Sequence, residues 1–259
     1  MPKVGKHEPG SFCWVELATT DQAAAKTFYS SIFHWEPRDS PIGPDDFYTI
    51  FKLDGQPAAA AYTMRPAESA AAPPHWTLYI KVENADEAAA KAAELGGAVI
   101  DQPFDVSSAG RMAVIQDPPG AVFCLWQSKE QPGLGVTHEN GAFCWADLAS
   151  TDPARARAFY QGMFGWKIGP APNYPPGYEV IDNGGPAPVG GIGPIRGGEG
   201  LPSHWMLFFI ADDVDGVAAK TKELGGTVQM GPVSMGPVRM AALADPQGAA
   251  FSIIRPPAA

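Results

Sequence analysis

The stretch GSFCWVELATTD at residues 10–21 decides the fold, because a close copy of it, GAFCWADLASTD, occupies residues 141–152. The same spacing relates FYSSIFHW at residues 28–35 to FYQGMFGW at residues 159–166. Matches that keep one order along a chain are typical of a duplicated structural unit. The sequence therefore predicts two homologous units in tandem.

The repeat continues through both copies and sets the expected domain limits. The tetrapeptide ELGG occurs at residues 94–97 and again at residues 223–226. A length of 259 residues also suits two domains at about 150 residues each. We expect a first domain over residues 8–128 and a second over residues 139–256, joined by a polar, glycine-containing linker.

Each copy divides again into two similar halves, in which a strand is followed by a helix and then by short strands. We expect Thr20 to cap the first helix, Asn84 to cap the second, and Ser150 or Thr151 to cap the corresponding helix of the second copy. The first copy is expected to contain strands at 11–18, 34–38, 46–53, 57–64, 75–82, 98–104, 111–116 and 121–127, with helices at 21–33 and 85–95. The pattern predicts an α+β protein with mixed sheets.

Composition and charge exclude several classes of protein. Hydrophobic residues make up 45% of the chain, and 18 basic against 28 acidic residues give a formal charge of −10. That sign disfavours nucleic acid and anionic membranes as partners. We find no membrane span and no signal peptide, and the cysteines Cys13, Cys124 and Cys144 lack the spacing of a disulfide framework. We expect a cytoplasmic protein.

Three motifs resemble the vicinal oxygen chelate superfamily, which includes glyoxalase I, extradiol dioxygenases and bleomycin-resistance proteins. They are WVELATTD at residues 14–21, A-x-x-F-Y-x-x-x-F-x-W at residues 25–35, and the D-P-x-G turn at residues 117–120 and 245–248. The tandem arrangement also resembles two-domain glyoxalase-like proteins of bacteria. The resemblance implies paired βαβββ modules, two per domain, that curl a mixed sheet into a cup around a small-molecule site.

The resemblance also implies a divalent metal held by His, Gln or Glu side chains, and the sequence does not match that expectation. The positions that correspond to the ligands hold Trp14, Thr77 and Cys124 in the first copy and Trp145, Met206 and Ser252 in the second. Of these side chains only a cysteine is a usual metal ligand. We therefore expect no metal and no other cofactor, unless displaced ligands hold an ion.

Alternation along the strands selects the side chains that line the two cups. Each cup receives one carboxylate and one histidine, and Glu16 with His75 is the candidate catalytic pair for acid–base chemistry. The candidate ligand-binding residues are Trp14, Thr77, Tyr79, Arg111, Cys124 and Trp126 in the first copy, and Trp145, Asp147, His204, Met206, Arg239 and Ser252 in the second.

Structural roles for the same residues stay open. The histidines lie in P-H-W and S-H-W turns, where a ring commonly satisfies a backbone group. Glu16 and Asp147 are also candidates for buried salt bridges with Arg111 and Arg239. We interpret the glycine-rich run at residues 190–200 as a loop, because it matches no nucleotide-binding pattern.

Three functional hypotheses follow. The first is a glyoxalase-like protein that has lost the metal site and binds a small organic compound, to sequester or detoxify it. The second is a lyase or isomerase that acts on a carbonyl compound, as in methylglyoxal detoxification, either without a metal or with a displaced metal site. The third is a scaffold without a ligand. Because Met206 and Ser252 make the second cup less polar, we favour the first cup. We also expect a monomer that contains an internal pseudo-dimer.

Overall fold

The computed structural model describes residues 4–44, 46–170, 175–196 and 200–257, which form two mixed sheets of eight strands each. The first sheet contains β1 (Phe12–Thr19), β2 (Glu36–Pro41), β3 (Phe47–Leu53), β4 (Gln56–Thr63), β5 (His75–Lys81), β6 (Ala98–Val106), β7 (Gly110–Gln116) and β8 (Val122–Ser128). The second contains β9 (Phe143–Ser150), β10 (Lys167–Pro170), β11 (Glu179–Asp182), β12 (Gly190–Pro194), β13 (His204–Ile210), β14 (Thr227–Met235), β15 (Val238–Ala244) and β16 (Ala250–Arg255). The predicted fold class is confirmed.

The strand order shows how each sheet is assembled from two βαβββ modules. The first sheet has the order β2-β3-β4-β1-β5-β8-β7-β6, and the second repeats this order with β10-β11-β12-β9-β13-β16-β15-β14. Within the first sheet β1 pairs parallel with β4, β5 pairs parallel with β8, and the antiparallel pair of β1 with β5 joins the two modules. Glu16 thereby lies directly opposite Thr77.

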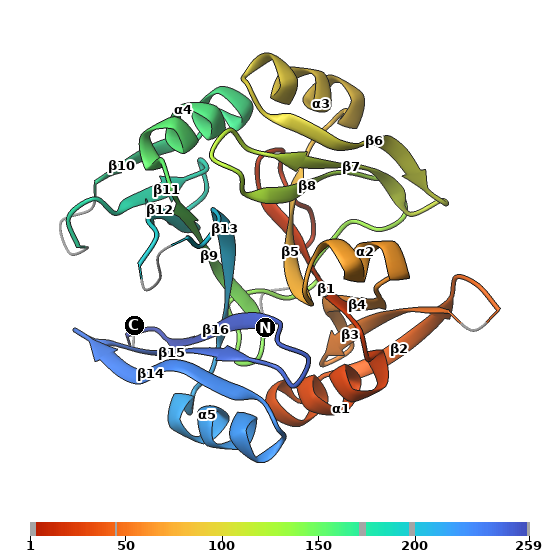
Figure 1. The fold of residues 1–259 in the computed structure, drawn as a ribbon, viewed down its shortest axis with the longest axis vertical. Coiled ribbons are helices and arrows are strands. Elements are labelled where there is room, and N and C mark those ends of the chain that lie inside the picture. Colours follow the sequence, from red (N-terminus) through yellow and green to blue (C-terminus); the bar gives the residue numbers. More distant parts are fainter. Residues whose placement is uncertain (1–3, 45, 171–174, 197–199, 258–259) are drawn as a thin grey trace.

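The helices α1 (Gln22–Phe33), α3 (Ala85–Glu94), α4 (Pro153–Phe164) and α5 (Val214–Glu223) lie on the periphery, outside the two sheets (Figure 1). Helix α1 contacts α5, and α3 contacts α4, so each contact joins one domain to the other. The first sheet curves around the right of the view and the second around the left, and their concave faces open in opposite directions (Figure 1). One continuous hydrophobic core runs through both domains, which form an internal pseudo-dimer.

The helix caps confirm one sequence prediction and correct two. Asn84 caps α3 as predicted, with its side chain accepting from the amides of the first turn. Helix α1 is capped by Asp21 instead of Thr20, and α4 by Asp152 instead of Ser150 or Thr151. In both helices the aspartate carboxylate accepts from the backbone amide three residues ahead, which is the geometry of an N-cap.

Two segments differ from the sequence expectations. A short helix, α2 (Pro66–Ala71), follows β4 and was not foreseen. The first part of the glycine-rich run is strand β12 and not a loop, while residues 197–199 of that run lie outside the described residues. Gly190 lacks a side chain because a Cβ there would meet the carbonyl oxygen of Ala146 on the neighbouring strand. No helix in the described ranges is long and apolar enough to cross a membrane.

A reciprocal pair of hydrogen bonds joins the two domains. The hydroxyl of Tyr29 on α1 donates to Asp245 Oδ2 at 3.0 Å, and the indole of Trp76 donates to the same hydroxyl at 3.0 Å. Asp245 is 2% exposed and also accepts from the backbone amide of Ala249. The mirror-related contacts are made by Tyr160, Asp117 and Trp205. Each domain thus supplies a hydrogen-bond donor to a buried carboxylate of the other domain.

We expect Tyr29→Phe to lower the free energy of unfolding by about 1–3 kcal/mol, because Asp245 and Trp76 each lose a buried hydrogen-bond partner. Urea denaturation measures this loss. Tyr160→Phe should give a similar loss, whereas Tyr62→Phe, a half-buried tyrosine outside the domain interface, serves as the matched control. Equal effects of Tyr29→Phe and Tyr62→Phe would contradict the interpretation.

Candidate functional site

The first cup is organised around Glu16, whose two carboxylate oxygens each accept a hydrogen bond from a tyrosine. Tyr48 donates to Oε2 at 2.5 Å and Tyr79 donates to Oε1 at 2.7 Å. The indole Nε1 of Trp14 donates in turn to the Tyr48 hydroxyl at 3.0 Å. These four side chains come from β1, β3 and β5, so the folded sheet is needed to bring them together.

Strand geometry explains this cluster. Trp14 and Glu16 are two residues apart on β1 and therefore share its concave face. Tyr79 lies opposite Trp14 in the antiparallel register of β1 and β5. The sequence placed these three residues correctly on one face, but it missed Tyr48. The signal for Tyr48 is the alternation in FYTIFKL, where Thr49, Phe51 and Leu53 are buried and Tyr48 faces the other side.

Burial controls the electrostatics of this cluster. Glu16 is 9% exposed, and burial raises its pKa, while the hydroxyls of Tyr48 and Tyr79 partly oppose that rise. Burial, followed by the proximity of Glu16, raises the pKa of both tyrosines well above the ordinary value. The tyrosines therefore remain protonated hydrogen-bond donors at neutral pH, and the carboxylate is their acceptor.

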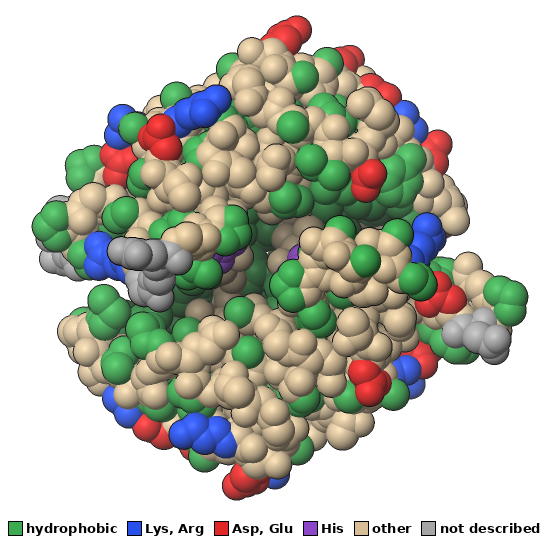
Figure 2. Space-filling model, in the orientation of Figure 1, with side chains coloured by type: hydrophobic (Ala, Val, Ile, Leu, Met, Phe, Trp, Pro, Cys, Tyr) green, Lys and Arg blue, Asp and Glu red, His purple; other side chains and the backbone are tan. Residues whose placement is uncertain are grey.

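The wall of the cup on the β8 side is aromatic and neutral. Cys124 lies beside Tyr79 in the parallel register of β5 and β8. Burial raises the pKa of its thiol well above the ordinary value, so the thiol stays protonated. Trp126 packs edge-on against Tyr79 with ring centroids 6.3 Å apart. In Figure 2 the surface is hollowed near its centre, where the two domains meet, and hydrophobic side chains border that hollow.

A second carboxylate reaches the first cup from α2. Tyr62 on β4 donates a hydrogen bond to Glu68 Oε1. Glu68 lies close enough to Glu16 to contribute to the rise in the pKa of Glu16. The sequence interpretation missed Glu68, because PAESAA has no apolar periodicity that would predict a helix.

The structure does not join Glu16 to His75. The ring Nδ1 of His75 lies 2.8 Å from the carbonyl oxygen of Pro73, and His204 makes the same contact with Pro202 at 2.9 Å. In the β1–β5 register His75 is opposite Ala18, two pairs away from the pair of Glu16 with Thr77. Diagonal neighbours in a sheet are about 7–8 Å apart, which is too far for a hydrogen bond. Both histidines therefore contact a backbone carbonyl group, which is the structural role that their turns suggested.

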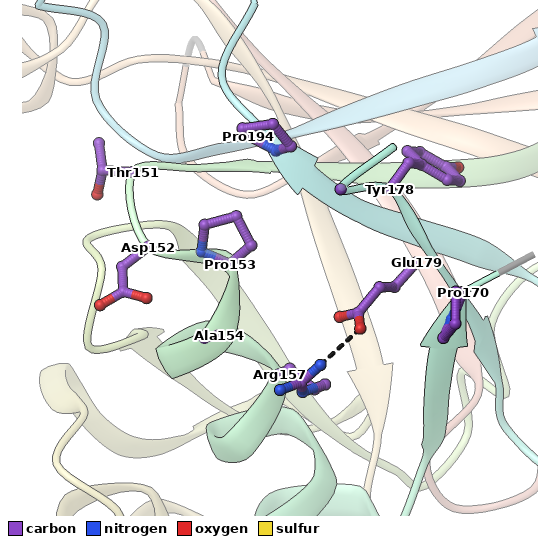
Figure 3. Close-up of a pocket in the computed structure, with 10 residues that line it drawn as sticks. Thr151, Asp152, Pro153, Ala154, Arg157, Pro170, Tyr178, Glu179 and Pro194 are labelled. Carbon is purple, nitrogen blue, oxygen red and sulfur yellow. Dashed lines mark hydrogen bonds and ion pairs between the residues drawn. The ribbon is translucent and has the colours of Figure 1, made fainter. Parts of the chain in front are cut away.

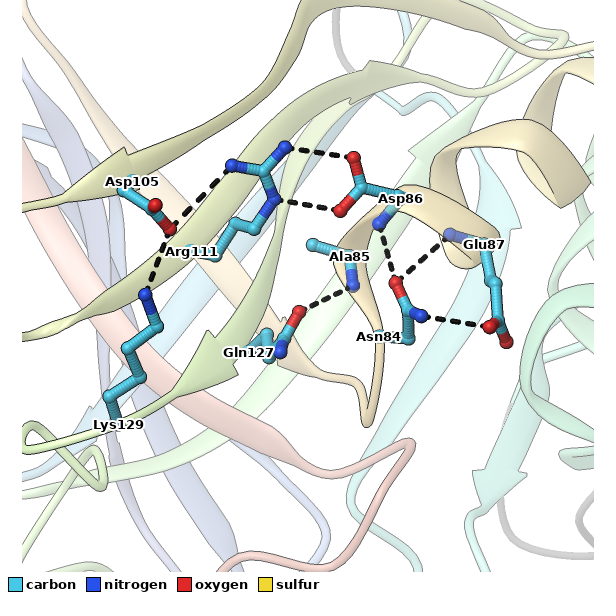
Figure 4. Close-up of polar contacts among 8 residues, drawn as sticks. All are labelled: Asn84, Ala85, Asp86, Glu87, Asp105, Arg111, Gln127 and Lys129. Atoms are coloured by element: carbon cyan, nitrogen blue, oxygen red, sulfur yellow. Dashed lines mark hydrogen bonds and ion pairs between the residues drawn. The ribbon is translucent and has the colours of Figure 1, made fainter.

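The expected pairing of the arginines with the cup carboxylates is wrong. Arg111 donates from Nε and Nη2 to Asp86 at the start of α3, at 2.7 and 2.8 Å (Figure 4). Arg239 makes the equivalent bidentate pair with Asp215 on α5, at 2.7 and 2.5 Å. Each arginine lies on the helix-facing side of its strand. Because successive side chains of a strand point to opposite faces, each arginine points away from the carboxylate of its cup.

The second cup contains a similar cluster with one hydrogen-bond donor fewer. Asp147 Oδ1 accepts from the indole of Trp145 at 2.6 Å and from the hydroxyl of Tyr178 at 2.6 Å. Burial raises the pKa of Asp147. Phe208 stands opposite Trp145, where Tyr79 stands in the first cup, so this hydroxyl donor is missing. The surrounding wall is apolar and includes Met206, Met240 and Ile254, while Ser252 pairs with Phe208.

A groove of about 590 Å³ lies beside the start of α4, and Tyr178 of the second cup is among its lining residues (Figure 3). Its lining includes Asp152, Pro153, Pro194 and the ion pair between Arg157 Nη1 and Glu179 Oε1, which are 2.5 Å apart. At the position of Pro153 the first domain has Gln22, whose amide donates to backbone carbonyls of β3 and β4. The position of Pro153 is therefore occupied in the first domain by a hydrogen-bonded polar side chain.

Comparison with known proteins supports the assignment suggested by the fold. Residues 11–125 match the family described as Glyoxalase/Bleomycin resistance protein/Dioxygenase superfamily, and residues 145–254 match the family described as Glyoxalase-like domain. A Mycobacterium tuberculosis protein named "Putative glyoxylase CFP32" is 38% identical, and the match covers 99% of this chain and 98% of the relative. The chain belongs to this glyoxalase superfamily.

Other relatives and solved structures have varied descriptions. The "Anthracycline biosynthesis protein DauV" of Streptomyces sp. strain C5 is 32% identical, over 95% of this chain and 93% of the relative. The Mn(II)-bound glyoxalase from Novosphingobium aromaticivorans has a TM-score of 0.66 at 15% identity, over 95% of this chain and 82% of that one. The 2,3-dioxygenase LapB from Pseudomonas sp. KL28 also has a TM-score of 0.66, at 12% identity, over 98% and 93% of the two chains. The structural matches show a shared fold.

The cup residues do not fit the metal site that is common in the glyoxalase superfamily. Trp14 and Thr77 offer no usual ligand, which leaves the Cys124 thiol as the one usual ligand among these three positions. Both oxygens of Glu16 already accept from tyrosines. Among the described residues, no group of three or more His, Cys, Asp or Glu side chains is placed to hold an ion.

Because the pKa of Glu16 is raised in the folded protein, we expect the free energy of unfolding to depend on pH. Because the folded protein holds this proton to a higher pH than the unfolded chain, the stabilisation is complete below the ordinary value of 4.5 and is lost as the pH rises through the folded value. We expect the free energy of unfolding of the parent to fall relative to Glu16→Gln above that pH, by at most about 1.4 kcal/mol per pH unit.

Urea denaturation of both proteins at a series of pH values measures this difference. Glu94→Gln, on the exposed face of α3, is the matched control and should track the parent. A difference between Glu16→Gln and the parent that does not change with pH would show that Glu16 has an ordinary pKa.

Proposed function

We propose that the first cup binds a small, planar organic molecule directly through its side chains, without a metal. The observation that carries this proposal is the fixed, buried carboxylate of Glu16 among the rings of Trp14, Tyr48 and Tyr79. Two hydrogen bonds hold the carboxylate in one orientation before any ligand arrives. Such preorganisation lowers the entropy cost of binding.

The chemistry of the walls favours a flat ligand. Aromatic side chains offer large, rigid contact surfaces and prefer offset or edge-to-face contacts with other rings. A few convergent polar groups in an apolar site fix the orientation of a ligand. In the first cup Glu16 supplies that polar group, and Trp14 and Trp126 supply apolar surface. The second cup, with Phe208 and Met206 at the corresponding positions, offers fewer polar groups.

The relatives support a ligand of this kind. The names of two relatives at 32% identity, from Streptomyces sp. strain C5 and Streptomyces peucetius, refer to anthracycline biosynthesis, and anthracyclines are polycyclic aromatic compounds. We propose that this chain likewise handles an aromatic compound, which it sequesters or detoxifies. We also propose that the tandem chain works as a monomer, since its two domains already bury against each other.

One observation favours an enzyme as the second candidate. A carboxyl group with a raised pKa is suited to transfer protons near neutral pH, and burial raises the pKa of Glu16. A lyase or isomerase that acts on a carbonyl compound would use Glu16 as its acid or base. His75 would not assist through a direct hydrogen bond to Glu16, because its ring contacts Pro73.

Calorimetric titration with a panel of planar aromatic compounds, together with a turnover assay on methylglyoxal-derived substrates, tests the proposal. We expect at least one panel compound to bind the parent and Glu16→Gln to weaken that binding by about tenfold or more, which corresponds to about 1.4 kcal/mol. Asp147→Asn, the equivalent change in the second cup, is the matched control and should leave the affinity unchanged.

The remaining outcomes are also informative. Turnover that is lost in Glu16→Gln while the fold is retained would favour the lyase or isomerase. Weaker binding in Asp147→Asn with no effect of Glu16→Gln would place the site in the second cup and contradict the proposal. Neither binding nor turnover would favour a scaffold without a ligand.

A further inference from the structure

Helix α2 is held at the first cup by polar contacts and not by packing. None of its six residues, Pro66–Ala71, is buried. The hydrogen bond from Tyr62 to Glu68 ties the helix to β4, and Glu68 Oε2 also accepts from the backbone amide of Arg65. In the second domain the described residues between β12 and β13 form no helix. Helix α2 is therefore a feature of the first domain that directs Glu68 toward the concave face.

The two carboxylates of the first cup have no cationic partner. Neither Glu16 nor Glu68 takes part in an ion pair among the described residues, although Lys and Arg side chains elsewhere pair with surface acids. The charged or titratable groups that act on Tyr62 are Glu16, Glu68 and Cys124. Those that act on Cys124 include Glu16 and Asp101, which are also acids. The cup thus combines acidic groups with aromatic rings.

Buried charges in proteins are paired or coordinated, because an isolated charge in a low-dielectric site is costly. Glu16 has two tyrosine hydrogen bonds and no ion-pair partner among the described residues, and a cation bound beside it would favour its ionised form. The faces of Trp and Tyr rings attract organic cations, and the attraction is stronger where water is excluded. In the first cup Trp14, Tyr48, Tyr62 and Tyr79 surround or adjoin the two carboxylates.

We propose that the first cup selects organic cations, meaning planar molecules that carry a protonated or quaternary nitrogen, with Glu68 on α2 as the residue that adds this selectivity to Glu16. This inference rests on the proposed ligand-binding function and specifies the charge of the ligand. The cation supplies the counter-charge that the fold omits, and the aromatic rings contact its flat faces.

Two probes of nearly equal shape test the charge preference. N-Methylquinolinium is a flat cation, and 1-methylnaphthalene is its neutral counterpart. We expect calorimetric titration of the full chain to show that the cation binds at least about tenfold more tightly than the neutral probe. The preference should shrink as the salt concentration rises, because salt screens charges that remain partly accessible.

Glu68→Gln should reduce the preference for the cation by about fivefold or more, because the amide keeps the shape of the side chain and removes its charge. Because the amide oxygen of the variant can still accept the hydrogen bond from Tyr62, this variant should keep the parent's near-ultraviolet circular dichroism and melting temperature. Glu94→Gln, an exposed acid on α3, is the matched control and should retain the full preference.

The outcomes separate this inference from the proposed function. Equal affinity for the two probes, or an unchanged preference in Glu68→Gln, would overturn the selectivity for cations and leave ligand binding intact. The same conclusion holds if a neutral compound of the aromatic panel binds while N-methylquinolinium does not. If neither probe and no panel compound binds, both the inference and the proposed function are wrong.

Discussion

A tyrosine from each domain donates a hydrogen bond to a buried aspartate of the other, and the arrangement of the two sheets depends on this exchange. Asp245 lies in the D-P-x-G turn before the last strand, where the backbone amides of its own turn satisfy one oxygen and Tyr29 satisfies the other. Burial raises the pKa of this aspartate, so its partners matter for the stability of the fold. With Asp117 and Tyr160 repeating the contact, the domains dock through their helix-bearing sides and the concave faces remain free.

The two concave faces show how a duplicated fold acquires two chemistries. Both keep a tryptophan, a tyrosine and a carboxylate joined by hydrogen bonds. In the first cup Tyr79 adds a second donor to Glu16, and α2 brings Glu68. In the second cup Phe208 replaces that donor, and methionines cover the wall. The first cup is therefore acidic and aromatic, whereas the second is largely apolar.

The internal repeat and strand alternation predicted most of the fold and the central residues of the first cup. Trp14, Glu16 and Tyr79 share one face because their spacing and the register of β1 with β5 require it. Arg111 was proposed as a partner of the cup carboxylate because the repeat pairs it with Arg239, and such a match does not determine which face of the strand the side chain occupies. Its true partner, Asp86, begins the helix that covers the opposite face.

Features that depend on contacts between distant segments could not be predicted. Tyr48 reaches Glu16 only because β3 and β4 fold back beside β1. The glycines of β12 read as a loop, yet Gly191 is required there because a side chain would meet the ring of Tyr178. Likewise α2 has no apolar stripe, and only its contact with Tyr62 shows why Glu68 matters. In each case tertiary contacts override the local preference of the sequence.

The central claim is that side chains, and not a metal ion, form the binding centre of the first cup. The most direct measurement is elemental analysis for Mn, Fe, Co, Ni and Zn on protein purified without a chelator or an affinity tag, followed by equilibrium dialysis against Mn²⁺. The account predicts well under one equivalent of metal per chain in both experiments. About one equivalent, lost when Glu16 is changed to Gln, would contradict it and make Glu16 a displaced metal ligand.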